Sequence, residues 1–142
     1  MDAIQIVIDT NVIVTAFRSA RGAGHLLLQG LGDPRWQMNV STALVLEYEA
    51  ELKREFGRQG RSLASADEAV DDLVRAANRW SIPRLYRPLL SDPGDEFVLE
   101  LAIESGSAYV VTYNQGHFRG VEDFGVRAIR PMEFLRILEA EP

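Results

Sequence analysis

Four widely separated positions carry side chains whose oxygens could together bind a metal ion. Asp9 ends an apolar run, Glu47 lies in an otherwise apolar helix start, and Asp95 and Asn114 stand beside later elements of the chain. Zero cysteines and only two histidines exclude a thiolate site and an ordinary catalytic zinc site. Any bound metal is therefore expected to be a hard cation held by oxygen ligands.

The first of these residues follows a clear strand signal. The run Ile4-Gln-Ile-Val-Ile8 predicts a buried parallel strand that delivers Asp9 to the carboxyl edge of a sheet. Open α/β sheets bind their ligands at that edge. A simpler interpretation stays open, in which Asp9 only caps the next helix by accepting a bond from a first-turn amide.

Strand and helix signals alternate along the chain. This alternation predicts a three-layer α/β/α fold with a mostly parallel sheet of four or five strands, in one domain that spans residues 1–142. The segment 82–90 contains two prolines and is expected to be an edge strand or an extended connection at best. We expect strands at 4–8, 36–40, 108–112 and 126–129, and helices at 12–17, 23–31, 41–57, 66–80, 92–105 and 131–139.

The other three candidate ligands also have structural explanations. Glu47 would lose hydration on a mostly apolar helix unless a cation, water, or a pairing with Lys53 or Arg54 compensated it. Asp95 heads an apolar stripe that should meet the sheet, whereas Asp92 is better explained as a helix N-cap. Asn114 could equally be a turn residue with left-handed backbone geometry.

Charge and hydropathy limit the classes of protein that remain. A net charge of −6 argues against a protein that coats nucleic acid nonspecifically, although it does not exclude a nuclease. Fourteen of the 15 basic residues are arginines, whose planar fork suits phosphate. The chain starts without a signal segment and has no apolar stretch long enough for a membrane span, so a cytoplasmic protein is expected.

The motifs, taken in order, resemble a known family. Ile8-Asp9-Thr10-Asn11-Val12 opens the chain, Ser41-Thr42 precedes Glu47, Asp92-Pro-Gly-Asp95 precedes an apolar helix, and Val111-Thr-Tyr-Asn114 follows with Phe118 near the end. In this order and spacing they resemble the PIN-domain family, particularly its bacterial VapC-like ribonuclease branch. The resemblance covers nearly the whole length.

The resemblance implies a function and a set of partners. Members of this kind are typically Mg²⁺- or Mn²⁺-dependent ribonucleases that hydrolyse RNA, often toxins restrained by a cognate antitoxin and often homodimers. It implies that Asp9, Glu47 and Asp95 are the central acidic ligands. Asn114 falls where many members carry a fourth Asp, which lowers the negative charge of the site.

Residues around this site are expected to support it. Without metal, the clustered carboxylates should repel one another, so that at least one binds a proton more readily than usual. Candidates for orienting the ligands and water are Thr10, Asn11, Ser41 and Thr112. Candidates for contacting the RNA backbone are Arg18, Arg21, His117 and Arg119.

Three other classes of protein share some of these features. A haloacid-dehalogenase-type phosphatase needs a second Asp where this chain has Asn11, and a receiver-like domain needs a late lysine, whereas the only lysine is Lys53. Both are disfavoured. The stronger rival is a PIN-like module that is catalytically weak because of Asn114 and acts by binding RNA or protein.

Overall fold

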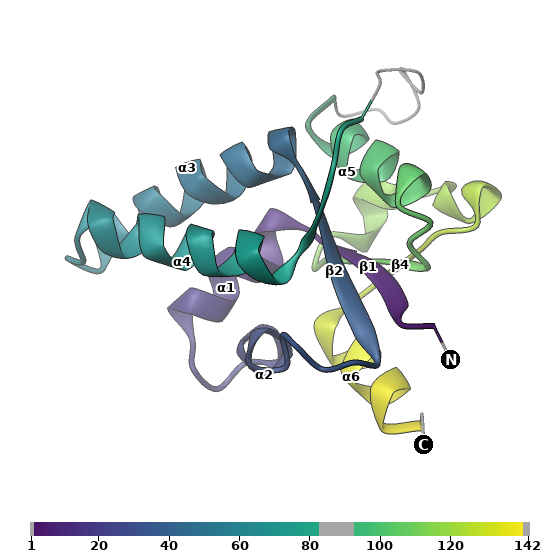
Figure 1. Cartoon of the computed structure of the whole chain (residues 1–142), viewed down its shortest axis with the longest axis horizontal. Coiled ribbons are helices and arrows are strands. Elements are labelled where there is room, and N and C mark those ends of the chain that lie inside the picture. Colours follow the sequence, from purple (N-terminus) through teal and green to yellow (C-terminus); the bar gives the residue numbers. More distant parts are fainter. Residues whose placement is uncertain (1, 83–92, 141–142) are drawn as a thin grey trace.

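The computed structural model describes residues 2–82 and 93–140 as alternating strands and helices (Figure 1). The strands are β1 (Ile4–Ile8), β2 (Trp36–Ser41), β3 (Asn78–Trp80), β4 (Tyr109–Val111) and β5 (Arg127–Ile129). The α-helices are α1 (Thr10–Arg18), α2 (Ala23–Gln29), α3 (Thr42–Arg58), α4 (Leu63–Ala76), α5 (Pro93–Glu104) and α6 (Pro131–Ala140). Two short 3-10 helices, η1 (Gln115–Phe118) and η2 (Val121–Phe124), follow β4.

The five strands form one sheet in the order β3-β2-β1-β4-β5, and every pair is parallel. This confirms the predicted α/β class with a parallel sheet. The central strand β1 is flanked by β2 and β4, and its residues Ile6, Val7 and Ile8 have no exposed surface. A strand covered on both faces reads as a continuous apolar run, which is why the sequence signal at β1 was strong.

Helices cover both faces of the sheet (Figure 1). Helix α5 packs against β1, β2 and β4. On the face that carries Ile4, Ile6 and Ile8, Phe134 of α6 makes edge-to-face contacts with Trp36 and Tyr109, at centroid distances of 5.8 and 5.9 Å. The strand order reverses between β1 and β4, and such a switch point is where open α/β sheets form a ligand crevice.

The helix that carries Glu47 begins as predicted and ends later than predicted. The Ser41 hydroxyl accepts a hydrogen bond from the Leu44 amide at 3.3 Å and so caps α3. Gly57 was expected to stop this helix but lies inside its last turn. Gly60, with a φ of +73°, follows the helix and adopts the left-handed geometry that glycine allows without steric cost.

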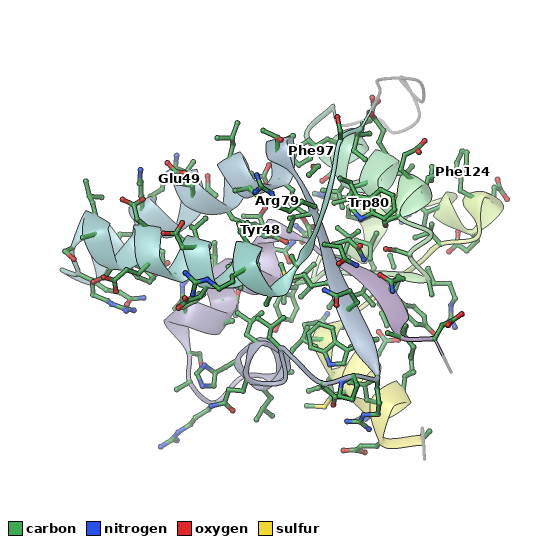
Figure 2. The ribbon with its side chains drawn as sticks, in the orientation of Figure 1. Tyr48, Glu49, Arg79, Trp80, Phe97 and Phe124 are labelled. Atoms are coloured by element: carbon green, nitrogen blue, oxygen red, sulfur yellow. The ribbon has the colours of Figure 1, made fainter. Side chains whose placement is uncertain are left out.

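The prediction of a helix over residues 66–80 was wrong at both ends. It begins earlier, at Leu63 after the cap Ser62, and it ends at Ala76. Residues Asn78–Trp80 instead form the edge strand β3, in register with the end of β2. The Trp80 indole, labelled in Figure 2, donates a hydrogen bond to the buried Asn39 side chain at 2.8 Å. This sheet contact overrides the local helical spacing.

Parts of two expectations fall outside the described residues. Most of the predicted extended segment 82–90 and the predicted cap Asp92 lie there. No helix of the described part of the chain is both long and apolar enough to span a membrane.

Candidate active site

A cleft of about 440 Å³ opens at the carboxyl edge of the sheet, beside the switch point between β1 and β4. Asp9 reaches it from the end of β1, Glu47 from α3, Asp95 from the first turn of α5, and Asn114 from the segment after β4. The four residues that the sequence singled out thus line one cleft. Parallel topology explains this, since it brings the ends of separate strands to a single rim.

Asp9 is held in place by three donors. It is the N-cap of α1, and its Oδ1 accepts a bond from the Thr10 amide at 2.9 Å. Its Oδ2 accepts bonds from the Thr112 hydroxyl at 2.8 Å and from the Asn11 amide group at 3.1 Å. The Asp9 carboxylate therefore caps the helix, as the simpler interpretation expects, and it also lines the cleft.

The residues that surround Asp9 link the start of α1 to the end of β4. The Asn11 side chain donates to the Thr112 hydroxyl at 3.3 Å and accepts from the Tyr113 amide at 3.1 Å. The Thr112 hydroxyl also accepts from the Asn114 amide at 3.0 Å. The predicted supporting residues Asn11 and Thr112 thus form one network across the switch point.

Glu47 is half-buried, and its carboxylate accepts a hydrogen bond from the Thr10 hydroxyl. The predicted alternative, a pairing of Glu47 with Lys53 or Arg54, is wrong. Lys53 pairs with Glu49 and Asp67, and Arg54 pairs with Glu51, at N to O distances of 2.8, 3.5 and 3.4 Å. Tyr48, the next residue (Figure 2), points to the sheet and donates a hydrogen bond to the Ile8 carbonyl.

The two carboxyl groups at the centre bind protons more readily than usual. Burial is the largest cause that raises the pKa of Asp9, and the hydrogen bonds from Thr112 and Thr10 only partly oppose it. Burial also raises the pKa of Glu47, with further contributions from the negative charges of Asp9, Glu51 and Asp95. The expected direction is confirmed, although burial outweighs the predicted repulsion.

Asp95 and Asn114 complete the rim. Asp95 lies 3.3 Å from His117, measured from Oδ2 to Nδ1, and its side chain is 14% exposed. Asn114 is exposed, with a φ of −108°, so its backbone does not take the left-handed geometry that was the alternative explanation. Its position in the cleft instead follows from the bond between its amide and Thr112.

The oxygen donors of the cleft are of the kind that a hard cation prefers. Three carboxylates and one amide supply oxygen donors, and burial raises the pKa of Asp9 and Glu47, so that their ionised forms are costly without a compensating charge. In the described residues, no three His, Asp or Glu side chains stand close enough to grip an ion together. Magnesium keeps several of its waters and needs only one or two direct carboxylate ligands, so this spacing fits it.

The four predicted substrate-binding residues divide into two pairs. Arg18 and His117 line the cleft, whereas Arg21 and Arg119 are exposed in neighbouring loops and do not. Ser41 caps α3 and lines a separate cavity of about 220 Å³. Sequence reasoning missed Glu51, which lines the cleft one helical turn after Glu47 and could have been found from that spacing.

Comparison with known proteins identifies the family. The model of the PIN domain family matches residues 5–116, and the chain belongs to this family. No curated protein sequence is significantly similar to it.

Two solved structures share its fold. One is a chain of VapBC2 from Rickettsia felis bound to a DNA fragment from their promoter, 12% identical, with a TM-score of 0.62 over 88% of this chain and 98% of that one. The other is a chain of VapBC-1 from nontypeable Haemophilus influenzae, 16% identical, with a TM-score of 0.61 over 91% and 99%. At such low identity these likenesses establish the fold alone.

Proposed function

We propose that the chain, as a single PIN-like domain over residues 1–142, is a divalent-metal-dependent endoribonuclease and the toxin of a toxin–antitoxin pair. Membership of the PIN domain family and the fold shared with chains of VapBC complexes support the proposal. The observation that carries it is the cleft itself, where the carboxylates of Asp9, Glu47 and Asp95 arrive from three separate elements. Mg²⁺ is the expected metal, with Mn²⁺ as its substitute.

The residues of the cleft have distinct roles in this proposal. Asp9, Glu47, Asp95 and Asn114 would hold the metal, one or two of them directly and the others through its bound waters. When bound, the metal would supply an activated water and neutralise the phosphoryl and leaving oxygens. Thr112 and Asn11 fix the orientation of the Asp9 carboxylate, and Thr10 fixes that of Glu47. His117 and Arg18 lie where they can contact backbone phosphates of the RNA.

Protein partners follow from the neighbours. The two similar structures are both VapBC assemblies, and one is bound to promoter DNA. By analogy, we propose a cognate antitoxin for this chain and a homodimer as its assembly. Regulation by such a partner would restrict RNA cleavage to conditions in which the antitoxin is lost.

Asn114 favours one alternative, a binding module that cleaves weakly. An amide in place of a carboxylate makes the rim less negative and weakens the attraction for a second cation. Such a module would bind RNA or protein without Mg²⁺- or Mn²⁺-dependent hydrolysis. The alternative shares the fold and differs only in catalysis.

An RNA cleavage assay separates these functions. The purified protein should cleave single-stranded RNA with Mg²⁺ or Mn²⁺, and a chelator should abolish the activity. Glu47→Gln should abolish it as well, while Glu49→Gln, two residues away on α3 and outside the cleft, should not. No cleavage under any metal condition, with RNA binding retained, would favour the binding module. Full activity of Glu47→Gln, with contaminating nucleases excluded, would overturn the proposed site.

A further inference from the structure

Helices α1 and α3 lie side by side along the cleft and run in the same direction. The Thr10 hydroxyl bonds to Glu47, and the Arg18 guanidinium bonds to Glu55, so two contacts eight residues apart on each helix have the same sequence separation of 37. Equal offsets arise only when two helices advance together. One end of this seam carries the candidate metal ligands, and the other carries Arg18.

Glu55 is the centre of the second end. Its side chain is only 4% exposed, and its Oε1 accepts bonds from Arg18 Nε at 3.1 Å and Nη2 at 2.7 Å. Arg58 lies 3.2 Å from the same oxygen. Gln59 donates to Oε2 at 2.9 Å and to the Phe17 carbonyl at 3.2 Å, which ties the end of α3 to the end of α1.

This arrangement fixes the Arg18 fork from one side. Nε and Nη2 bind Glu55, whereas Nη1 makes no hydrogen bond to any described residue. The Arg18 side chain is 49% exposed and lines the cleft, so its remaining N–H groups are available to a ligand there. Arg18 and Arg58 both contact the Glu55 carboxylate, so the cluster of these three side chains keeps a net positive charge.

The position of Arg18 defines which part of a substrate it can meet. Of the described residues that line the cleft, Arg18 and His117 are the basic ones, and His117 already faces Asp95. Seven residues of helix separate Asn11 from Arg18, which is about 10 Å along the axis. Arg18 therefore suits a phosphate flanking the one that reaches the carboxylates.

We propose that Glu55 is a positioning residue that holds Arg18 at the mouth of the cleft to bind a flanking backbone phosphate of single-stranded RNA. The inference rests on the proposed function and adds the residue that orders one substrate contact. An arginine already held on one side loses little further freedom when it binds, which increases affinity. Because this contact lies away from the carboxylates, it should act on KM more than on kcat.

Charge-conserving substitution tests the proposal. Glu55→Asp keeps the negative charge but withdraws the carboxylate by one methylene, and Glu49→Asp is the matched control on the same helix. Affinity for a short fluorescent single-stranded RNA is measured by anisotropy in the Glu47→Gln background, where the RNA stays intact. We expect Glu55→Asp to weaken binding by about threefold to tenfold, a scale set by loss of one ordered charge contact, and Glu49→Asp to leave it unchanged.

A double-mutant cycle separates positioning from folding. Arg18→Ala should weaken binding and reduce the slope of log K against log salt by about 0.7, the value for one phosphate contact with a single strand. In the Arg18→Ala background, Glu55→Asp should have no further effect on affinity, because its effect passes through Arg18. Thermal unfolding of each variant reports any purely structural loss, which would persist in that background.

The outcomes are distinct. Unchanged affinity of Glu55→Asp, or equal losses with and without Arg18, would overturn the positioning role while leaving a cleaving wild type as evidence for the nuclease. Tighter binding by Glu55→Gln together with unchanged binding by Glu55→Asp would show that Glu55 merely neutralises Arg18. A wild-type protein that neither binds nor cleaves RNA would overturn the proposed function and this inference together.

Discussion

Glu47 and Glu55 lie on the same helix, eight residues apart, and both bond to α1, yet their environments shift their acidity in opposite directions. Burial and neighbouring carboxylates raise the pKa of Glu47. Hydrogen bonds from Arg18 and Gln59 lower the pKa of Glu55. Among the described residues, the two ends of this helix pair thus differ in whether an arginine is paired with the glutamate.

Glu55 and Glu47 differ in the groups that surround their carboxylates. At Glu55 the chain supplies two arginines and an amide, so the carboxylate is compensated within the protein. At Glu47 the bonded partner among the residues that the structure describes is the Thr10 hydroxyl, a neutral group, while Asp9 and Asp95 add negative charge. A group of ionised carboxylates that destabilises the fold by itself and is stabilised by a bound cation is the pattern expected of a metal site.

The largest effect should come from removing a carboxylate of the proposed metal site. Asp9→Asn should lower kcat for RNA cleavage by at least about a thousandfold, because several kcal/mol of metal-dependent stabilisation would be lost. Arg18→Ala, at the other end of the helix pair, should instead raise KM with a small effect on kcat. Steady-state kinetics on one RNA substrate measures both changes.

Asp71→Asn is the matched control for the first substitution, because Asp71 is exposed on α4 and outside the cleft. It should leave both kinetic constants unchanged. If Asp9→Asn retained more than about a tenth of the wild-type kcat, Asp9 would not be a metal ligand of the kind proposed. Circular dichroism of the variant excludes unfolding as the cause.

The second effect concerns the support of Asp9. Thr112 is fully buried, and its hydroxyl bonds to Asp9, Asn11 and the Asn114 amide. Thr112→Val keeps the shape but leaves buried polar groups without this partner, so the free energy of unfolding should fall by about 2 kcal/mol. Urea unfolding, followed by circular dichroism, measures the change.

Thr42→Val provides the control, since Thr42 is exposed at the first position of α3. It should change the free energy of unfolding by no more than about 0.5 kcal/mol. Equal stability of Thr112→Val and wild type would show that the network across β1 and β4 is not what holds Asp9. The hydrogen bonds of Thr112 would then not explain how Asp9 is held in the cleft.

The gathering of Asp9, Glu47, Asp95 and Asn114 in one cleft could be predicted from sequence because its signals are local. A buried parallel strand is a continuous apolar run, so the position of Asp9 at its end could be read directly. Parallel topology then gathered Glu47, Asp95 and Asn114 at the same rim without any knowledge of strand order. The position of each of these residues depends on one segment alone or on a rule that holds for every parallel sheet.

The Glu55 end of the helix pair could not be predicted, since it depends on how two helices pack. The bond between Arg18 and Glu55 requires the relative offset of α1 and α3, which no periodicity within either helix contains. The same limit explains β3. Its residues continue a helical pattern, and only pairing with β2 and the bond from Trp80 to Asn39 make them a strand.

The third effect is a pH dependence of stability at the Glu55 end. Because the pKa of Glu55 is lower in the folded protein than its ordinary value, its ionised form stabilises the fold at neutral pH. This contribution is present above the ordinary pKa and is lost as the pH falls through the folded value. Glu55→Gln should therefore lower the Tm at pH 7, and the difference from wild type should shrink on acidification.

Thermal unfolding between pH 7 and pH 3 measures this convergence. Glu49→Gln is a suitable comparison, because Glu49 is a partly exposed member of a surface pair with Lys53, and such pairs contribute little to stability. A Tm difference between wild type and Glu55→Gln that stays constant down to pH 3 would contradict the assignment of the stabilisation to the ionised carboxylate.

The smallest effect is expected at Glu47 and has the opposite sign. Because its pKa is raised in the folded protein, the ionised form carries a cost that is complete at pH 7 and is relieved as the pH falls through the folded value. Glu47→Gln keeps an acceptor for the Thr10 hydroxyl and removes the charge. In a chelator, the variant should melt about 2 °C higher than wild type, a small gain because the group is half exposed to solvent screening.

Added Mg²⁺ should reverse the order of the Tm values of wild type and Glu47→Gln. A cation that binds only the folded state stabilises it by mass action, so the wild-type Tm should rise with Mg²⁺ concentration. Glu47→Gln, with one carboxylate fewer, should gain less, and Glu55→Gln should gain as much as wild type. If Glu47→Gln melted lower than wild type in chelator, its carboxylate would already be compensated within the chain. Glu47 and Glu55 would then not differ in charge compensation, and this argument for a metal site at Glu47 would be lost.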